Sequence, residues 1–256
     1  MKQNPALNAF LKSFAILFIL SACKNENKEA LRVAVAANAR YAMEEMVRAY
    51  EAENETHVEL VISSSGKLTA QIAAGAPYDV FVSADTLYPQ SLYRQGFTQQ
   101  PSRIYGYGAL VLFSTKEEGD ISIAQLSSPH IQHIALANPE SAPYGQAAME
   151  VLRHFDSGQM LSEKLVYGES IAQTTQFILS GAAELGFTAK SVVAAPEMQN
   201  IGKWISIPDS LYTPIAQGAI IIDGRKTPHD DALPFYSFLF SEKGNEIWES
   251  YGYDVK

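Results

Sequence analysis

The 256-residue chain has a single cysteine, so it can form no internal disulfide and must draw its stability from a hydrophobic core. It is also short of positive charge, with 19 Lys and Arg against 28 Asp and Glu and a formal net charge of −9 at pH 7. Such a chain is a poor partner for nucleic acid or an anionic lipid surface. Long-range attraction is therefore not what would gather an anionic ligand.

No apolar run in the sequence is long enough to cross a bilayer as a helix. The longest, SFAILFILSA at 13–22, has ten residues, whereas a spanning helix needs about 20. Residues 1–12 before it carry two lysines and no acidic residue, which is the layout of a secretory signal. We therefore expect residues 1–22 to be a signal peptide and the protein to be exported.

The segment LSAC at 20–23 resembles the lipobox of bacterial lipoproteins, in which cleavage leaves a lipid-carrying cysteine as the new N-terminus. Cys23 follows the apolar run directly and precedes the polar KNENKE, so lipidation is favoured over an unmodified buried cysteine. We expect a lipidated tether at 23–30 and a periplasmic or extracytoplasmic, lipid-anchored location. The mature chain keeps 17 basic against 28 acidic residues, a net charge of −11, so we expect no nucleic acid partner and membrane contact through the lipid only.

From residue 31 onwards, short apolar segments typical of strands alternate with amphipathic segments typical of helices. Expected strands lie at 31–37, 57–62 and 78–84, with helices at 41–53 and 69–76 between them. This βαβαβ order predicts a parallel sheet covered by helices. Further strands are expected at 109–113, 133–138, 164–168, 184–189 and 218–223, with helices near 146–156 and 171–181 and a helical pair at 232–252. The length left after the signal is enough for two α/β lobes.

Residues that carry enzyme chemistry do not form a recognisable arrangement. Lys67 follows a glycine, but its segment lacks the earlier glycine and the following hydroxyl residue of a phosphate-binding P-loop. His130 and His133 have no acidic partner at helical spacing, so a surface pair is favoured over a metal site. Asp79 and Asp85 flank a strand, where turn and cap roles are favoured over a catalytic pair. We expect no enzyme and no bound cofactor.

Four loops between an expected strand and the next helix are built from small and hydroxyl-bearing residues. They are AANAR (36–40), SSSGK (63–67), SAPYGQ (141–146) and ESIAQ (169–173). Open α/β sheets bind ligands at the carboxyl ends of their strands, and the N–H groups of helix starts favour an anion. Such loops together would hold a deprotonated oxyanion without a cation. Taken singly, each Ser or Asn is also an ordinary helix cap, and we expect Arg40 and Lys67 to be solvated.

Three of these segments carry a family resemblance. VAVAANAR (33–40), SSSGKLTAQIAAGAPYDVFVSAD (63–85) and NPESAPYGQAA (138–148), with the closing YGY, resemble the periplasmic molybdate-binding proteins of ABC importers. The resemblance implies an α/β, two-lobe type II periplasmic binding protein fold, in which each lobe is a mostly parallel sheet flanked by helices and the ligand lies in the interlobe cleft. It places the first lobe at 31–107 and 223–256 and the second at 108–222. It also implies a monomer that captures molybdate or tungstate and delivers it to an ABC permease.

The resemblance also suggests which residues hold the anion. The positions that match the family's ligand positions are Asn38, Ser65 with Ser64 beside it, Tyr144, and Ile171 through its backbone amide. These groups would bind the oxygens of the oxyanion and not coordinate the metal atom. Some members have a tyrosine where this chain has Ala189. We expect Tyr144 to supply a phenol in its place.

Other functions are compatible with parts of this pattern. Sulfate, another tetrahedral dianion, is the alternative within transport; phosphate is disfavoured because a protonated ligand favours a carboxylate acceptor. A hydrolase of phosphate esters would need a metal cluster or a nucleophile with a base. The effector domain of a transcription regulator is opposed by the export signal and by the lack of a helix-turn-helix segment.

Overall fold

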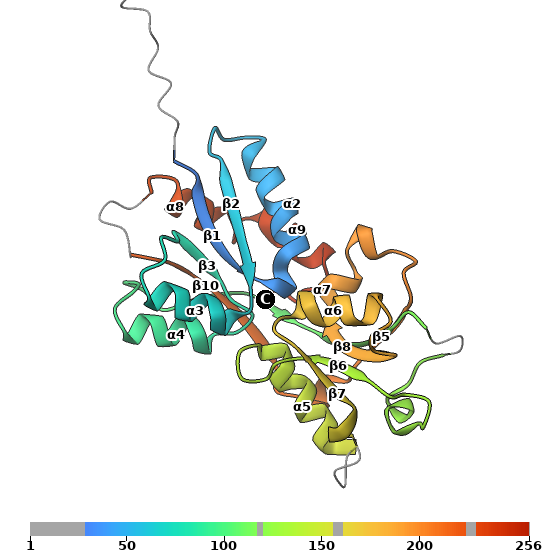
Figure 1. Cartoon of the computed structure of the whole chain (residues 1–256). Coiled ribbons are helices and arrows are strands. Elements are labelled where there is room, and N and C mark those ends of the chain that lie inside the picture. The colour runs from blue at the N-terminus through green and yellow to red at the C-terminus, as the bar shows by residue number, and fades with distance from the viewer. Residues whose placement is uncertain (1–28, 117–119, 156–160, 224–228, 256) are drawn as a thin grey trace, which may run out of the picture.

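The chain folds into two α/β lobes, each built on a five-stranded sheet (Figure 1). The computed structural model describes residues 29–116, 120–155, 161–223 and 229–255. The predicted signal peptide and Cys23 lie outside these residues. Within them, no helix combines the length and the apolar character that a membrane span requires. The two-lobe α/β fold class predicted from the sequence is confirmed.

The first lobe contains both the start and the end of the described chain. Its strands are β1 (Leu31–Ala36), β2 (Val58–Ser63), β3 (Val80–Val82), β4 (Arg103–Gly108) and β10 (Ile215–Ile221), in the order β2-β1-β3-β10-β4. Its helices are η1 (Ala37–Ala39), α2 (Arg40–Glu51), α3 (Ser65–Ala73), α4 (Leu87–Arg94), α8 (Ala232–Phe238) and α9 (Glu242–Ser250). β1 runs parallel to β2 and β3, whereas β10 is antiparallel to β3 and β4.

Alternation along β1 directs its side chains into two separate cores. Val33 and Val35 belong to the larger core, with Met43 and Met46 of α2, while Ala34 joins the smaller one under α3 and α4. All are fully buried, as the period of two along a strand requires when both sheet faces are covered. Burying a side chain the size of valine or methionine contributes about 1.5–3 kcal/mol. These cores hold the carboxyl end of β1 in a fixed position.

The second lobe repeats the arrangement with a shorter set of strands. They are β5 (Leu110–Ser114), β6 (Ile134–Ala137), β7 (Leu165–Gly168), β8 (Leu185–Ala189) and β9 (Lys203–Ser206), in the order β7-β6-β8-β5-β9. Its α-helices are α5 (Pro143–Phe155), α6 (Ile171–Leu179) and α7 (Lys190–Val193), and its short 3₁₀ helices are η2 (Ile123–Ser127), η3 (Ser162–Lys164), η4 (Pro196–Met198) and η5 (Asp209–Leu211). β6 is parallel to β7 and β8, and β5 is antiparallel to β8 and β9.

The chain crosses between the lobes twice, and the second crossing corrects the predicted boundary. It first passes from β4 to β5 near residue 109, and it returns between β9 and β10. The prediction assigned 108–222 to the second lobe, but β10 pairs with β3 and β4 in the first sheet. An apolar strand pattern does not reveal which sheet the strand joins. Because of β10 and β5, both sheets are mixed, with parallel and antiparallel pairs.

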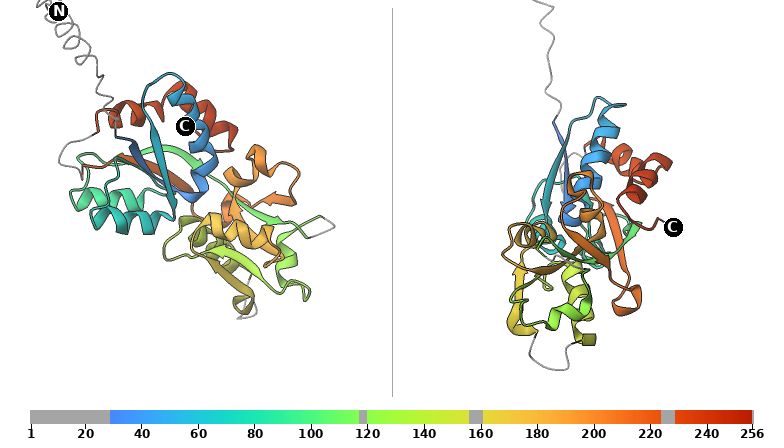
Figure 2. Two further views of the ribbon diagram at one scale, coloured as in Figure 1. Left: turned by 45° about the horizontal axis from the view of Figure 1, so that its top comes forward. Right: turned by 90° about the vertical axis from the view of Figure 1, so that its right-hand side faces the viewer.

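The views in Figures 1 and 2 show how the C-terminal helices return to the first lobe. α9 packs on α2 and on β4, and α8 packs on β10. Trp248 of α9 is fully buried and stacks on Tyr105 of β4, with ring centroids 4.3 Å apart. The sequence pattern missed β4, β9 and α4. β4 contains two glycines, β9 is a largely exposed edge strand, and α4 is short and contains Pro89.

Candidate functional site

Loops from both lobes meet around one small cavity between the sheets. The carboxyl ends of β1 and β2 point toward the second lobe (Figure 1). The lining residues are Ala36, Ala37, Asn38, Ser64, Ser65, Ala84, Ala142, Pro143, Tyr144 and Ile171. Each of the four loops singled out in the sequence contributes, and the loop after β3 adds Ala84. The structure therefore brings the five predicted ligand-binding residues together.

The cavity is compact. The space open to the centre of a water molecule is about 10 Å³, within about 200 Å³ of empty volume. A cavity of roughly this size is the smallest that can hold a water molecule. A sugar, a peptide or a nucleotide does not fit this space.

Ser64 places a buried, unpartnered hydroxyl at the cavity wall. It occupies the N-cap position of α3, where a serine side chain normally accepts a hydrogen bond from a backbone N–H of the first turn. Here the side chain makes no cap bond, and its Oγ has no hydrogen-bond partner among the described residues, although Ser64 is only 3% exposed. A buried hydroxyl without a partner costs about 1–3 kcal/mol. Its donor and acceptor capacity is available to a ligand.

Ser65 is held differently from its neighbour. Its Oγ accepts a hydrogen bond of 2.9 Å from the backbone N–H of Ala84, and the residue is 1% exposed. Because the oxygen is already an acceptor, the hydroxyl hydrogen is left to be donated. Ser65 also begins α3, whose first N–H groups have no carbonyl partner within the helix. The site thus offers an N–H and an O–H from one residue.

Tyr144 lies in the first turn of α5, and its phenol is fully buried. The side-chain nitrogen of Gln217 donates to the phenol oxygen at 2.9 Å. Burial raises the pKa of Tyr144 well above its usual range, so the phenol keeps its proton at neutral pH. Like Ser65, Tyr144 therefore has its acceptor side occupied and its O–H group intact.

Asn38, in η1, uses its side-chain amide within the protein. Its Nδ2 donates to Gln217 Oε1 at 2.8 Å and to the Tyr253 hydroxyl at 3.1 Å. Both hydrogens of the amide nitrogen are thereby directed at protein acceptors. The group that Asn38 has left for a ligand is its backbone N–H at the helix start. Sequence reasoning found Asn38 but missed Gln217, for which the local sequence contains no signal.

Ile171 is the first residue of α6, and its side chain is buried against the cavity. Ser170 before it caps the helix in the ordinary way, because its hydroxyl accepts from the N–H of Gln173. That bond satisfies a later amide and leaves the N–H of Ile171 without a partner inside the helix. The positive end of the α6 dipole thus faces the cavity.

The charged residues in these loops form ion pairs instead of lining the cavity. Lys67 Nζ lies 2.5 Å from Glu169 Oε2, across the two lobes, and Arg40 Nε lies 2.8 Å from Glu44 Oε1. Both basic side chains are close to half exposed. No charged side chain is among the residues that line the cavity. Any anion here would be held by neutral donors and helix dipoles.

The two lobes are closed over the site by backbone and hydroxyl contacts. The N–H of Gly66 donates to the carbonyl of Ser141 at 3.0 Å, which joins the second and third loops. Tyr88 donates to the carbonyl of Glu140 at 3.1 Å. On the other side, the Ser191 hydroxyl donates to the Asn38 carbonyl at 2.7 Å. These bonds shield the cavity from solvent.

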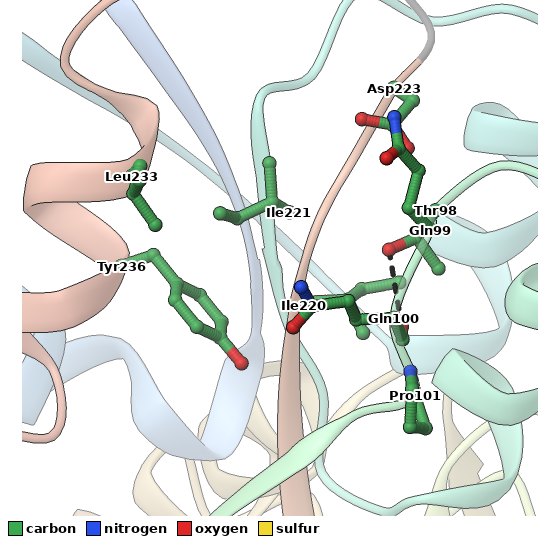
Figure 3. A pocket seen from close by; sticks show the side chains of 9 residues that line it. All are labelled: Thr98, Gln99, Gln100, Pro101, Ile220, Ile221, Asp223, Leu233 and Tyr236. Carbon is green, nitrogen blue, oxygen red and sulfur yellow. Dashed lines mark hydrogen bonds between the residues drawn. The ribbon is translucent and has the colours of Figure 1, made fainter.

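A second pocket, in the first lobe, has a different chemistry (Figure 3). It is lined by Thr98, Gln99, Gln100, Pro101, Ile220, Ile221, Asp223, Leu233 and Tyr236, and the space open to the centre of a water molecule is about 190 Å³. Its described lining includes the carboxylate of Asp223 and apolar side chains such as Ile220 and Leu233, and none of the predicted ligand-binding residues is among them. It is therefore separate from the predicted anion site.

The other residues considered for chemistry have structural contacts. Asp79 accepts from the backbone N–H of Arg32 at 2.8 Å, and Asp85 accepts from the N–H of Tyr88 at 3.1 Å. His130 lies 2.7 Å from a serine hydroxyl, and His133 lies near Glu184. In the described part of the chain, no group of three or more His, Cys, Asp or Glu residues is placed to hold a metal ion.

Comparison with known proteins relates both the sequence and the fold to one group. The family model of bacterial extracellular solute-binding proteins matches residues 31–254. Molybdate-binding protein ModA of Azotobacter vinelandii is 38% identical over 93% of this chain and 94% of its own length. ModA of Rhodobacter capsulatus is 34% identical over 86% of each chain. The solved periplasmic molybdate-binding protein of A. vinelandii superposes with a TM-score of 0.82 at 33% identity, covering 88% of this chain and 99% of that one.

Proposed function

This chain belongs to the family of bacterial extracellular solute-binding proteins, and we propose that it captures molybdate or tungstate and delivers the anion to an ABC permease. Two relatives that are more than 30% identical over most of the chain are named as molybdate-binding proteins. The compact cavity with uncharged walls supports the same ligand class, because a tetrahedral oxyanion has few atoms and accepts hydrogen bonds at every oxygen.

The observation that carries the proposal is the Ser64 hydroxyl, which is buried in the cavity without a partner. Buried polar groups in proteins are almost always hydrogen-bonded, so a hydroxyl at the cavity wall that makes no bond with the described residues is available to a ligand. A bound oxyanion would supply the acceptor. We assign its oxygens to the hydroxyls of Ser64, Ser65 and Tyr144 and to the backbone N–H groups of Asn38 and Ile171. The metal atom itself contacts no protein group.

The binding mechanism needs no proton transfer and no covalent step. Helix starts from both lobes direct N–H groups and dipoles at one point, and each is favourable to a dianion. Loops from the two lobes together surround the ligand, so binding draws the lobes together and excludes water. In this low-dielectric setting, hydrogen bonds to a charged ligand are stronger than they are in water.

Size provides selectivity among dianions. Molybdate, tungstate and sulfate present the same kind of acceptor, so neutral donors do not separate them by charge. A cavity whose donors are spaced for the larger anions leaves sulfate short of some of them, at about 1–3 kcal/mol for each buried donor left unpaired. The wall formed by Tyr144 sets one side of that spacing.

The location follows from the N-terminal segment. We infer that Cys23 is lipidated after removal of residues 1–22, and that the tether holds a monomeric binding protein at the outer side of a membrane. A single acyl chain binds a membrane only reversibly, so stable anchoring requires more than one chain on the cysteine. The membrane contact resides in this lipid, and the folded lobes stay free to bind the permease.

The test is a calorimetric titration of the processed protein with molybdate, tungstate, sulfate and phosphate. We expect one site per chain, with molybdate and tungstate at least about tenfold tighter than sulfate, which corresponds to about one unpaired donor. If sulfate bound more tightly than molybdate and tungstate, the protein would be assigned to sulfate transport instead. If none of the four anions bound, the proposed function would be wrong.

A further inference from the structure

Gln217 is a fully buried polar residue at the point where the chain re-enters the first lobe. It lies on β10, and the pairing of β10 with β4 shifts register between Gln217 and Gly218. Its side chain makes hydrogen bonds in two directions. Oε1 accepts from Asn38 Nδ2 at 2.8 Å and lies 2.7 Å from the Tyr105 hydroxyl, while Nε2 donates to the Tyr144 hydroxyl at 2.9 Å. One amide thus joins Asn38 and Tyr105 of the first lobe to Tyr144 of the second.

Gly108 provides the space that this contact occupies. It ends β4 at the first crossing between the lobes. A Cβ at this position would overlap the Tyr144 hydroxyl and the Gln217 amide nitrogen. Glycine has no Cβ, so the two polar groups can meet directly beside the backbone of the crossing strand.

We propose that Gln217 is a positioning residue that makes Tyr144 a hydrogen-bond donor to the anion. A phenol has one hydrogen and accepts through its oxygen. By donating to that oxygen, Gln217 Nε2 fills the acceptor side of Tyr144 and leaves its O–H to be donated. The inference rests on the proposed function, and it deepens that function by explaining how an uncharged site presents a donor.

The bond also joins the two lobes. Gln217 belongs to the first sheet, whereas Tyr144 belongs to α5 of the second lobe. The group that orients the phenol therefore comes from the opposite lobe.

A double-mutant cycle tests the positioning role, with Kd for molybdate as the readout. Gln217→Met keeps the approximate length of the side chain but removes its polar atoms. We expect it to weaken binding by roughly tenfold in the wild-type background, comparable to one hydrogen bond to a charged group. In the Tyr144→Phe background the same change should have an effect of less than about threefold, because there is no hydroxyl left to orient.

Two further variants separate positioning from a general loss of structure. Gln217→Glu keeps an acceptor for Asn38 but replaces the donor to Tyr144 by an acceptor, so it should weaken binding more than Gln217→Met does. Thr188→Val is the matched control: Thr188 is equally buried, and its hydroxyl pairs with that of Thr175 at 2.8 Å. Thr188→Val should lower thermal stability but keep the Kd for molybdate within about twofold of the wild-type value, since the proposed contacts with the anion are unchanged.

The outcomes distinguish this inference from the proposed function. Binding of molybdate by the wild-type protein tests the function, and only the cycle tests Gln217. Equal losses for Gln217→Met in both backgrounds would show a structural role and overturn the inference while leaving the function intact. A Gln217→Met protein that binds as the wild type does would overturn it as well. If the wild type binds sulfate in place of molybdate, the same cycle is run with sulfate.

Discussion

Replacing Ser64 by alanine separates ligand binding from folding stability. The Ser64 hydroxyl has no hydrogen-bond partner among residues 29–116, 120–155, 161–223 and 229–255, so its removal breaks no hydrogen bond within them. Ser65 is the matched comparison, since it is equally buried and adjacent, but its Oγ accepts from the Ala84 N–H. Ser65→Ala therefore removes a hydroxyl from the cavity and also leaves a buried amide without an acceptor.

The expected magnitudes follow from these contacts. A hydrogen bond to a charged group contributes about 1.5–3 kcal/mol, so each substitution should weaken molybdate binding by roughly tenfold to 150-fold. Only Ser65→Ala should also destabilise the ligand-free protein, by about 1–3 kcal/mol for the unpaired amide. In a domain of this size that corresponds to about 2–4 °C in Tm per kcal/mol. Ser64→Ala should instead melt at or above the temperature of the wild type, because it removes a buried hydroxyl that makes no hydrogen bond with the described residues.

Thermal unfolding with and without molybdate, together with calorimetric titration, measures both quantities. A ligand at about 100 times its Kd stabilises the folded state by about 2.7 kcal/mol, so a tenfold loss of affinity halves the effect at the same concentration. Undiminished molybdate affinity in Ser64→Ala would refute the idea that its hydroxyl awaits an anion. Equal destabilisation of the two ligand-free variants would refute the hydrogen-bond reasoning.

Three other changes test separate features. Lys67→Ala removes an ion pair with Glu169 that is about half exposed, so molybdate affinity should change by less than about fivefold. The change should become smaller at high salt, and we expect the same of Arg40→Ala. A larger loss that does not depend on salt would show that Lys67 binds the anion. Gly108→Ala would force apart the two side chains that meet beside it, so molybdate binding should fall by more than about tenfold, and unchanged calorimetry would contradict the close approach. Cys23→Ala should abolish incorporation of labelled lipid and release the protein from membranes, whereas a wild type found wholly in the soluble fraction would contradict the anchor.

The sequence was informative where structure depends on near neighbours. Short apolar segments predicted β1 and β2, and helical spacing predicted α2. Where such a strand ends and a helix begins, the small and hydroxyl residues mark a loop at the carboxyl edge of the sheet. This is why Ser64 and Ser65 were found as candidates before their surroundings were known. Their location at one cavity follows from parallel strands, whose carboxyl ends share an edge.

The sequence by itself determined the alternation of strands and helices, the helix starts and the small and hydroxyl-bearing residues of the candidate loops. Only the tertiary structure decided which sheet β10 joins, and with it the position of Gln217 beside Tyr144. Asn38 and its partner Tyr253 are 215 residues apart in the chain. Local propensity contains no information about such pairs, because they form when separate elements pack. For the same reason, only the packed structure could show that Ser64 is buried without a partner whereas Ser65 is not.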